Sequence, residues 1–301
     1  MDRSDIIFNL AQLLGCEARK DEPLSKHTTF KIGGTADTYI NVNNLGQLMS
    51  VVKECRESDV DYLVLGNGSN VLASDDGFRG VVIRLDGDFR KITLLEDGSV
   101  FCGAGATLAS LCKFALNNGL TGLEFGWGIP GTVGGAVFMN AGAYGGEMKD
   151  VVYSVSHIDK NGSVGRTDRD KLALGYRTSV YRHNDCIITG VTLRMKPGNP
   201  EEIRAKMDDF LGRRSDKQPL DYPSAGSVFK RPEGAFAGAL IEQCGLKGRS
   251  HGGACVSEKH AGFIINTGKA TAHDVKSLIR EVQTEVAEKT GYVLECELII
   301  L

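Results

Sequence analysis

Two glycine-rich stretches carry the residue types that bind phosphate groups. Residues 122–146 contain nine glycines in 25 positions, and Gly66-Asn-Gly-Ser-Asn70 follows the apolar run at 62–65. Glycine lets a backbone approach a ligand closely, and N–H groups left uncovered in such loops form sites for anions. A short helix after Gly131 would direct its N-terminus at a diphosphate. Two such loops in one chain predict binding of an extended dinucleotide.

Tight turns without a ligand are the alternative reading of each loop. The usual dinucleotide signature is missing, because CGAGATL at 102–108 resembles Gly-x-Gly-x-x-Gly but has Leu108 where a third small residue should allow close packing. We interpret this third stretch as a turn. No P-loop lysine pattern is present.

The charge balance and the cysteines exclude several classes of protein. The 35 basic and 38 acidic residues give a net charge of −3, so no general basic field predicts nucleic-acid binding. The N-terminus lacks the apolar core of a secretory signal, and no run is long enough to span a membrane. We therefore expect a cytoplasmic protein whose eight cysteines are reduced core residues. The group His251, Cys255 and His260 matches no standard zinc spacing, and no metal is expected.

The predicted elements mix strands and helices without regular alternation, which favours an α+β fold. Helices are predicted at 4–15, 45–55, 107–117, 235–245 and 272–290. Strands are predicted at 35–42, 62–66, 80–85, 100–105, 151–159, 186–195, 261–266 and 292–301. The helix at 272–290 has the clearest ends, because Thr271 and Asp274 form a capping box and Gly291 follows its last turn. Pro197 and Pro200 indicate a domain boundary.

Seven blocks, in this order, resemble the UDP-N-acetylenolpyruvoylglucosamine reductase family. They are PLSKHTTFKIGG, LVLGNGSNVL, GIPGTVGGAVFMNAGAYGGE, YRTSVYR, SAGSVFKRP, SEKHAGFIIN and LECELII. The resemblance runs from about residue 20 to the C-terminus. It implies an α+β fold with an FAD-binding domain of the vanillyl-alcohol-oxidase (PCMH) type in two α+β lobes, 1–92 and 93–198. The C-terminal strand could return to the first lobe, and residues 199–301 would form an α+β substrate-binding domain.

The same resemblance implies non-covalently bound FAD with its diphosphate between the two glycine-rich loops. The cofactor contacts it implies are Gly66, Asn67, Gly68, Ser69, Asn70, Gly128, Ile129, Pro130, Gly131, Thr132, Gly134, Gly135 and Asn140.

The implied reaction reduces the enolpyruvyl ether of UDP-N-acetylglucosamine-enolpyruvate to UDP-N-acetylmuramate, a step of peptidoglycan precursor synthesis. NADPH gives a hydride to flavin N5, which passes it to the methylene carbon of the substrate. Negative charge then builds on the neighbouring carbon and its carboxylate, which need aimed donors and one proton.

Three residues match the family's catalytic positions. Ser227 would donate the proton, Arg177 would bind the pyruvyl carboxylate, and Glu297 would donate a proton or orient its partners. Without the resemblance, Ser227 is most simply a turn hydroxyl and Arg177 a surface cation. Side-chain chemistry alone does not choose Ser227 over Ser224, or Glu297 over Glu295.

Lys217, Lys230 and Arg231 are the candidate cations for the substrate diphosphate. The segment 183–222 is too short for the tyrosine-bearing insertion of the long family form, so the chain resembles the shorter form and the enclosure of the substrate is open. We expect a monomer without nucleic-acid or membrane partners. Two other functions stay possible at this point, a flavin oxidase with another substrate and a non-enzymatic sugar-nucleotide binding module.

Overall fold

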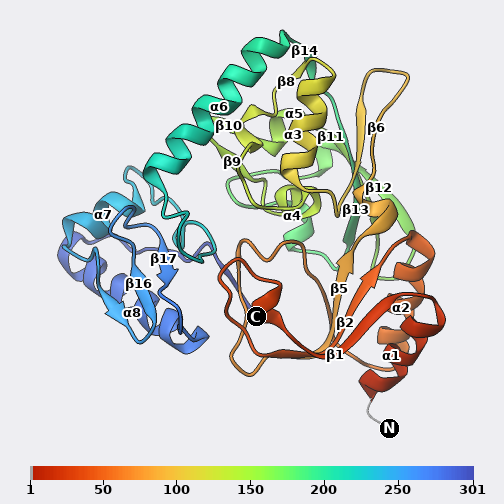
Figure 1. Ribbon diagram of the computed structural model, residues 1–301, viewed down its shortest axis with the longest axis horizontal. Helices are drawn as coiled ribbons and strands as arrows, with labels where there is room; N and C mark the ends of the chain where they lie inside the picture. Colours follow the sequence, from red (N-terminus) through yellow and green to blue (C-terminus); the bar gives the residue numbers. More distant parts are fainter. Residues whose placement is uncertain (1–2) are drawn as a thin grey trace. The chain divides into compact units, whose positions relative to one another are not determined.

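The computed structural model describes residues 3–301, which form two compact units, each with its own apolar core (Figure 1). The first unit comprises the described residues up to Lys20, residues 37–66 and residues 80–213. The second comprises residues 21–36, 67–79 and 214–301. The mixture of helices and strands confirms the predicted α+β class. The finer division at residues 92 and 198 stays a prediction.

The strands of the first unit form two principal sheets. One has the order β1-β2-β5-β3, and it consists of β1 (Glu17–Pro23), β2 (Thr35–Val42), β3 (Tyr62–Val64) and β5 (Phe78–Leu85). The strand ends at residues 21–23, 35–36 and 78–79 belong to the second unit. The other is antiparallel in the order β12-β11-β13-β7-β6. Its strands are β6 (Ile92–Leu94), β7 (Val100–Gly103), β11 (Val152–Ile158), β12 (Val164–Asp168) and β13 (Ile187–Leu193).

Two short ladders and six helices complete this unit. The ladders pair β8 (Leu120–Thr121) with β14 (Lys196–Pro197) and β9 (Gly142–Ala143) with β10 (Gly146–Glu147). The helices are α1 (Arg3–Leu13), α2 (Leu45–Glu57), α3 (Leu108–Asn117), α4 (Val133–Phe138), α5 (Met148–Val151) and α6 (Pro200–Lys217), whose last turn belongs to the second unit. Short 3₁₀ turns are η2 (Gly87–Arg90), η3 (Glu124–Gly126), η4 (Arg169–Lys171) and η5 (Val180–Arg182). Helix α4 packs on β7 and β13 and so fixes the glycine-rich segment around it against the five-stranded sheet.

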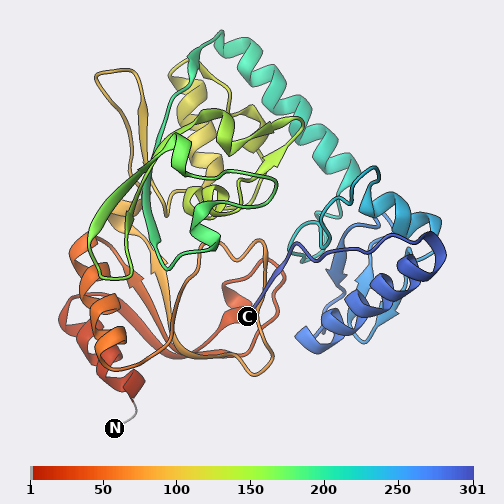
Figure 2. The same cartoon turned by 180° about the vertical axis from the view of Figure 1, so that it is seen from behind.

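The second unit contains a small sheet covered by a long helix (Figure 2). The sheet is antiparallel, β15 (Ser250–His251), β16 (Ala254–Val256) and β17 (Ile264–Asn266), and the helices are α7 (Ala237–Gln243) and α8 (Ala272–Thr290). The unit also holds the 3₁₀ turn η1 (Leu24–Lys26) and a parallel pair, β4 (Val71–Leu72) with β18 (Ile299–Ile300). Helix α8 has the predicted Thr271/Asp274 capping box and ends at Gly291 in the left-handed conformation, so both of its ends are confirmed.

The prediction of one strand over 292–301 is wrong, because only Ile299 and Ile300 form a strand. The segment changes partners along its length. Its residues 295–297 exchange backbone hydrogen bonds with residues 228–230, whereas β18 pairs with β4. A change of partner interrupts the ladder that a continuous strand needs. Both β4 and β18 belong to the second unit, and the return of the C-terminal strand to a first lobe of residues 1–92 stays a prediction.

No helix within residues 3–301 combines the length and the apolar character needed to cross a bilayer.

Candidate functional site

The first glycine-rich loop, residues 66–70, is built around Gly68, which is buried and has a φ of +59°. A Cβ at this position would lie 2.4 Å from the carbonyl oxygen of His27 and 2.7 Å from Thr28 Cα. Only glycine combines this left-handed conformation with so close an approach of two backbones. The absence of a side chain at Gly68 therefore allows the loop to pack directly against residues 27–28.

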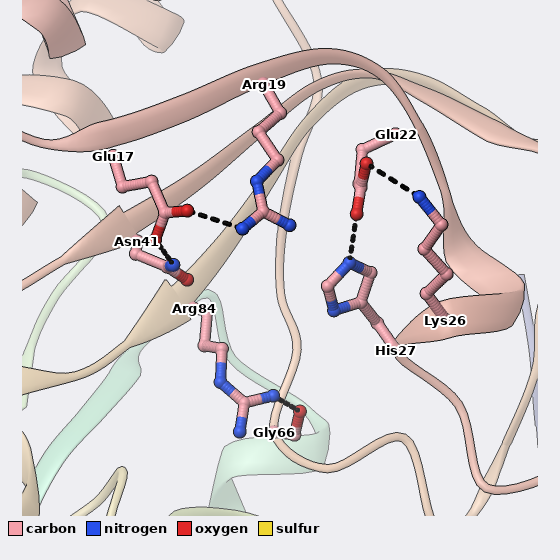
Figure 3. A network of polar contacts seen from close by, with 8 residues as sticks. All are labelled: Glu17, Arg19, Glu22, Lys26, His27, Asn41, Gly66 and Arg84. Atoms are coloured by element: carbon pink, nitrogen blue, oxygen red, sulfur yellow. Dashed lines mark hydrogen bonds and ion pairs between the residues drawn. The ribbon is translucent and has the colours of Figure 1, made fainter.

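A buried carboxylate fixes the segment against which Gly68 packs. Glu22, which is 6% exposed, accepts from His27 Nε2 at 2.9 Å and pairs with Lys26 at 3.6 Å (Figure 3). The same figure shows Arg84 of β5 donating from Nη1 to the carbonyl oxygen of Gly66 at 3.3 Å. Charged side chains thus fix the His27 side chain and the Gly66 carbonyl oxygen.

The first loop leaves backbone donors available. Within residues 3–301, the amide nitrogens of Gly68, Ser69 and Asn70 donate no hydrogen bond to the chain itself. A buried N–H without an acceptor costs free energy, which a bound acceptor recovers. Three successive donors of this kind fit a ligand with several acceptor oxygens.

The second loop contains the short helix that the sequence predicts, but its first N–H groups are occupied. Val133 and Gly134 donate to carbonyl oxygens of the segment 104–106 at 2.8 and 2.9 Å. Gly135 donates to the Thr132 hydroxyl, which caps the helix. The expectation that the N-terminus of α4 itself binds a diphosphate is therefore not supported by the geometry.

Open donors of the second loop lie before the helix. The amide nitrogens of Gly128, Gly131 and Thr132 donate to no other residue in the described range 3–301. The buried indole N–H of Trp127 also lacks an acceptor among the described residues. At Gly66 a Cβ would lie 2.5 Å from the Thr132 hydroxyl, so the start of the first loop touches the second.

A buried acid fixes the entrance to the second loop. Glu124, which is 3% exposed, accepts from the Thr121 hydroxyl at 2.5 Å and from the Gly122 amide at 3.0 Å. Burial opposes ionisation of this carboxyl, but those hydrogen bonds, with Lys206 at 3.8 Å, outweigh it and hold the pKa below its ordinary value. The turn that precedes Gly126 is therefore tied together by a charged group.

Several glycines are explained by packing of the chain on itself. A Cβ at Gly134 would lie 2.9 Å from Ala104 Cβ, and one at Gly146 would lie 2.6 Å from the Phe125 ring. In the third stretch, a Cβ at Gly103 or Gly105 would approach a backbone oxygen to 2.1 or 2.2 Å. The interpretation of residues 102–108 as a packed turn fits this geometry.

Arg177 lies in the first unit on a turn between Gly175 and Thr178, whose backbones hydrogen-bond to each other. Its φ of +55° is in the left-handed region. Its Nη2 donates to the carbonyl oxygen of Gly142 at 3.4 Å, and its guanidinium carbon lies 5.3 Å from the centre of the Tyr176 ring. The side chain thus stands beside the segment that follows α4.

The second unit brings Ser227 and Glu297 together. The Glu297 amide donates to the carbonyl oxygen of Val228 at 2.7 Å, so Glu297 lies opposite the neighbour of Ser227. The Ser227 hydroxyl donates to the carbonyl oxygen of Phe229 at 3.1 Å. Asn70, the last residue of the first loop, donates from Nδ2 to the carbonyl oxygen of Glu297 at 3.2 Å. The first glycine-rich loop and two of the three predicted catalytic residues therefore share one neighbourhood.

The two candidate glutamates, Glu295 and Glu297, differ in their contacts. Glu295, with a side chain 71% exposed, pairs with Lys230 at 2.9 Å. This pairing favours Glu297 for catalysis and engages one of the three predicted diphosphate cations. Arg231 lies over the Phe236 ring at 4.3 Å, and Lys217 is exposed at the end of α6.

The sequence analysis considered His260 only as part of a group that fits no zinc site. Its Nδ1 accepts from the Gly262 amide at 3.1 Å, and a Cβ at Gly262 would lie 3.5 Å from Ser227 Oγ. Burial lowers the pKa of His260, so the ring beside the Ser227 segment favours its neutral form. His251 pairs instead with Glu281 at 2.7 Å. Spacing gave no signal for Ser227 or Glu281, which lie far from these two histidines in the sequence.

Two family profiles match the chain. The profile described as FAD binding domain covers residues 36–168, and the profile described as UDP-N-acetylenolpyruvoylglucosamine reductase, C-terminal domain, covers residues 218–301. The predicted fold, an FAD-binding domain followed by a separate C-terminal domain, is confirmed by these matches.

Similar proteins extend over almost the whole chain. A UDP-N-acetylenolpyruvoylglucosamine reductase of Clostridium perfringens is 48% identical over 281 residues, which is 93% of this chain and 92% of the relative. One of Clostridioides difficile is 45% identical over 302 residues, covering 100% and 99%. The crystal structure of the Thermus caldophilus reductase superposes with a TM-score of 0.80 at 37% identity, covering 95% of this chain and 98% of that one.

Proposed function

The chain belongs to the UDP-N-acetylenolpyruvoylglucosamine reductase family, and from this premise we propose that it reduces UDP-N-acetylglucosamine-enolpyruvate to UDP-N-acetylmuramate with NADPH. It is an FAD-dependent oxidoreductase, since it carries the FAD-binding domain of that family. The observation that carries the proposal is the 45–48% identity to reductases over nearly their entire length. No observation favours an oxidase of another substrate or a binding module.

Bound FAD supplies a two-electron carrier that accepts a hydride from NADPH and passes it to the substrate. The unpartnered amides of each loop, taken by itself, support binding of its diphosphate without a covalent link to the chain. Those donors are Gly68, Ser69, Asn70, Gly128, Gly131 and Thr132. The other predicted contacts stay predictions, and they are Gly66, Asn67, Ile129, Pro130, Gly134, Gly135 and Asn140.

The catalytic residues act on the charge that the reaction creates. A hydride added to the methylene carbon leaves an electron pair on the neighbouring carbon, delocalised into the carboxylate. The Arg177 guanidinium binds this carboxylate through two parallel N–H bonds and stabilises the growing charge. Lys217, Lys230 and Arg231 stay the predicted cations for the diphosphate of the substrate, and Lys230 must first leave Glu295.

Ser227 delivers the proton that completes the reduction. Its O–H already donates to the Phe229 carbonyl oxygen, and rotation of the hydroxyl redirects this donor to the substrate carbon. Glu297, held opposite Val228, donates a proton to the carboxylate on which the charge builds, or orients Ser227. If a Glu297→Gln variant is reoxidised by substrate at the full rate, the role proposed for Glu297 is contradicted.

A substrate-dependent absorbance assay tests the proposal. The purified protein should show a flavin spectrum and oxidise NADPH only when the enolpyruvyl sugar nucleotide is present. Ser227→Ala should slow reoxidation by substrate about 10²–10⁴-fold, the contribution of a positioned general acid, while reduction by NADPH continues. Ser224→Ala is the matched control, since within residues 3–301 the Ser224 side chain makes no hydrogen bond, and its backbone carbonyl accepts from the Thr29 hydroxyl. Equally fast NADPH oxidation without the sugar nucleotide would contradict the proposal.

A further inference from the structure

Asn140 lies in the second glycine-rich segment, yet its side chain is engaged elsewhere. The residue is completely buried and has a φ of +43°. Its Nδ2 donates to the carbonyl oxygen of Gly175 at 2.9 Å and to Glu147 Oε2 at 2.5 Å, and its Oδ1 accepts from the Lys149 amide at 2.9 Å. Both N–H bonds of the side chain therefore have acceptors inside the protein, which leaves none for a cofactor phosphate.

The contact with Gly175 places Asn140 under the turn that carries Arg177. That turn depends on its surroundings, because a non-glycine residue in the left-handed region costs free energy. Two further hydrogen bonds join the same segments. Ser179 Oγ donates to the Phe138 carbonyl oxygen at 2.8 Å, and Arg177 Nη2 donates to that of Gly142. Asn140 is the middle of three connections between residues 138–142 and 175–179.

We propose that Asn140 is a positioning residue for Arg177 rather than a contact of the cofactor. By fixing the Gly175 carbonyl it holds the turn, and with it the direction of the guanidinium. Bidentate binding of a carboxylate depends on that direction and not only on the charge. A loosened turn keeps the positive charge but loses the paired geometry. The inference rests on the carboxylate-binding role proposed above for Arg177.

Two substitutions separate the side chain of Asn140 from its backbone. Asn140→Asp keeps the size but removes both N–H donors, and Asn140→Gly removes the side chain while accepting the left-handed backbone without strain. Each should slow reoxidation of the reduced enzyme by the enolpyruvyl sugar nucleotide about tenfold and raise its KM. Reduction by NADPH and the Kd for FAD should change less than about twofold. Asn118→Asp is the matched control, because Asn118 is exposed and its side chain donates to the Phe114 carbonyl oxygen, away from both loops.

A double-mutant cycle with Arg177→Lys decides whether Asn140 acts through Arg177. If it does, Arg177→Lys combined with Asn140→Gly should be no slower than Arg177→Lys alone. Fully additive losses, or an FAD Kd raised about tenfold by Asn140→Gly, would overturn the inference. If Asn140→Asp fails to fold, Asn140→Gly carries the test, with flavin content and thermal unfolding as checks.

The cycle also separates failure of the inference from failure of the proposed function. A slow Arg177→Lys with normal Asn140 variants removes only the positioning role. An unchanged Arg177→Lys removes the role proposed for Arg177, and the positioning role falls with it.

Discussion

The two glycine-rich loops are alike in composition but differ in what their backbone amides do. In the first loop the amides of Gly68, Ser69 and Asn70 have no acceptor within residues 3–301. In the second loop the amides of Gly128, Gly131 and Thr132 are open within the same range, whereas those of Val133, Gly134 and Gly135 donate to the chain itself. The first loop therefore offers mainly unpartnered backbone N–H groups, whereas much of the second loop packs against and hydrogen-bonds to its own chain.

This difference shows that a high glycine content indicates a backbone closely approached by other atoms. Those atoms can belong to a ligand or to the protein itself. Gly68 is required by its positive φ and by the neighbouring backbone, and the open amides follow from that conformation. Gly134 and Gly146 are required by Ala104 and by the Phe125 ring, with no ligand involved. Binding is indicated only where absent side chains and unpartnered donors coincide.

The largest effect is expected at Gly68. In Gly68→Ala the new Cβ meets backbone atoms at 2.4 and 2.7 Å in a left-handed conformation. The loop must move, at a cost of about 3 kcal/mol or more, and the affinity for FAD should fall at least about hundredfold. Flavin titration of the apoprotein measures it.

Gly98→Ala is the matched control for Gly68→Ala. Gly98 has a φ of +79° but nothing within 4 Å of its added Cβ. This variant should lose about 1 kcal/mol of stability and keep its affinity for FAD. If Gly68→Ala also binds FAD within a factor of about three of wild type, the distinction between the two loops fails.

A smaller effect is expected on the pH dependence of stability, and it concerns only the second loop. Glu124 is at the entrance to the second loop, and its pKa in the folded protein lies below its ordinary value of 4.5. Its ionised form therefore contributes stability above the unfolded pKa, and this contribution is lost as the pH falls through the folded pKa. Glu124→Gln should lower the free energy of unfolding by about 1–2 kcal/mol at neutral pH, and the difference from wild type should shrink on acidification. Denaturant unfolding at several pH values checks this, and a difference that grows in acid would contradict it.

The sequence predicted those parts of the fold whose signals are local. Helix α8 has its capping box and its terminal glycine within the helix and its flanks, and both lie where the pattern places them. The short helix α4 was also predicted, from apolar residues between glycines. The single strand over 292–301 was wrong, because its apolar pattern is compatible with one partner or with two in succession.

The site was predictable as a set of residue types but not as a set of contacts. The resemblance pointed to Ser227 and Glu297, which the second unit brings together. Asn70 contacts Glu297, which is 227 positions away in the sequence, and Asn140 contacts Gly175, which is 35 positions away. No local pattern encodes such pairs, since they depend on how the chain returns on itself. Both asparagines were therefore predicted only as cofactor contacts.

The smallest effect is expected at the cap of α4, where the second loop is bonded to its own chain. Thr132→Val keeps the shape but removes the hydroxyl that accepts from the Gly135 amide. Loss of this cap should cost about 1 kcal/mol of unfolding free energy, and Thr132→Ser should restore most of it because serine caps helices as well as threonine does. Because the Thr132 backbone amide is retained, the affinity for FAD should fall less than about fivefold, far less than for Gly68→Ala. Thermal unfolding and flavin titration measure the two quantities separately. A Thr132→Val variant with unchanged stability but abolished FAD binding would show that the Thr132 hydroxyl serves ligand binding rather than the packing of the second loop.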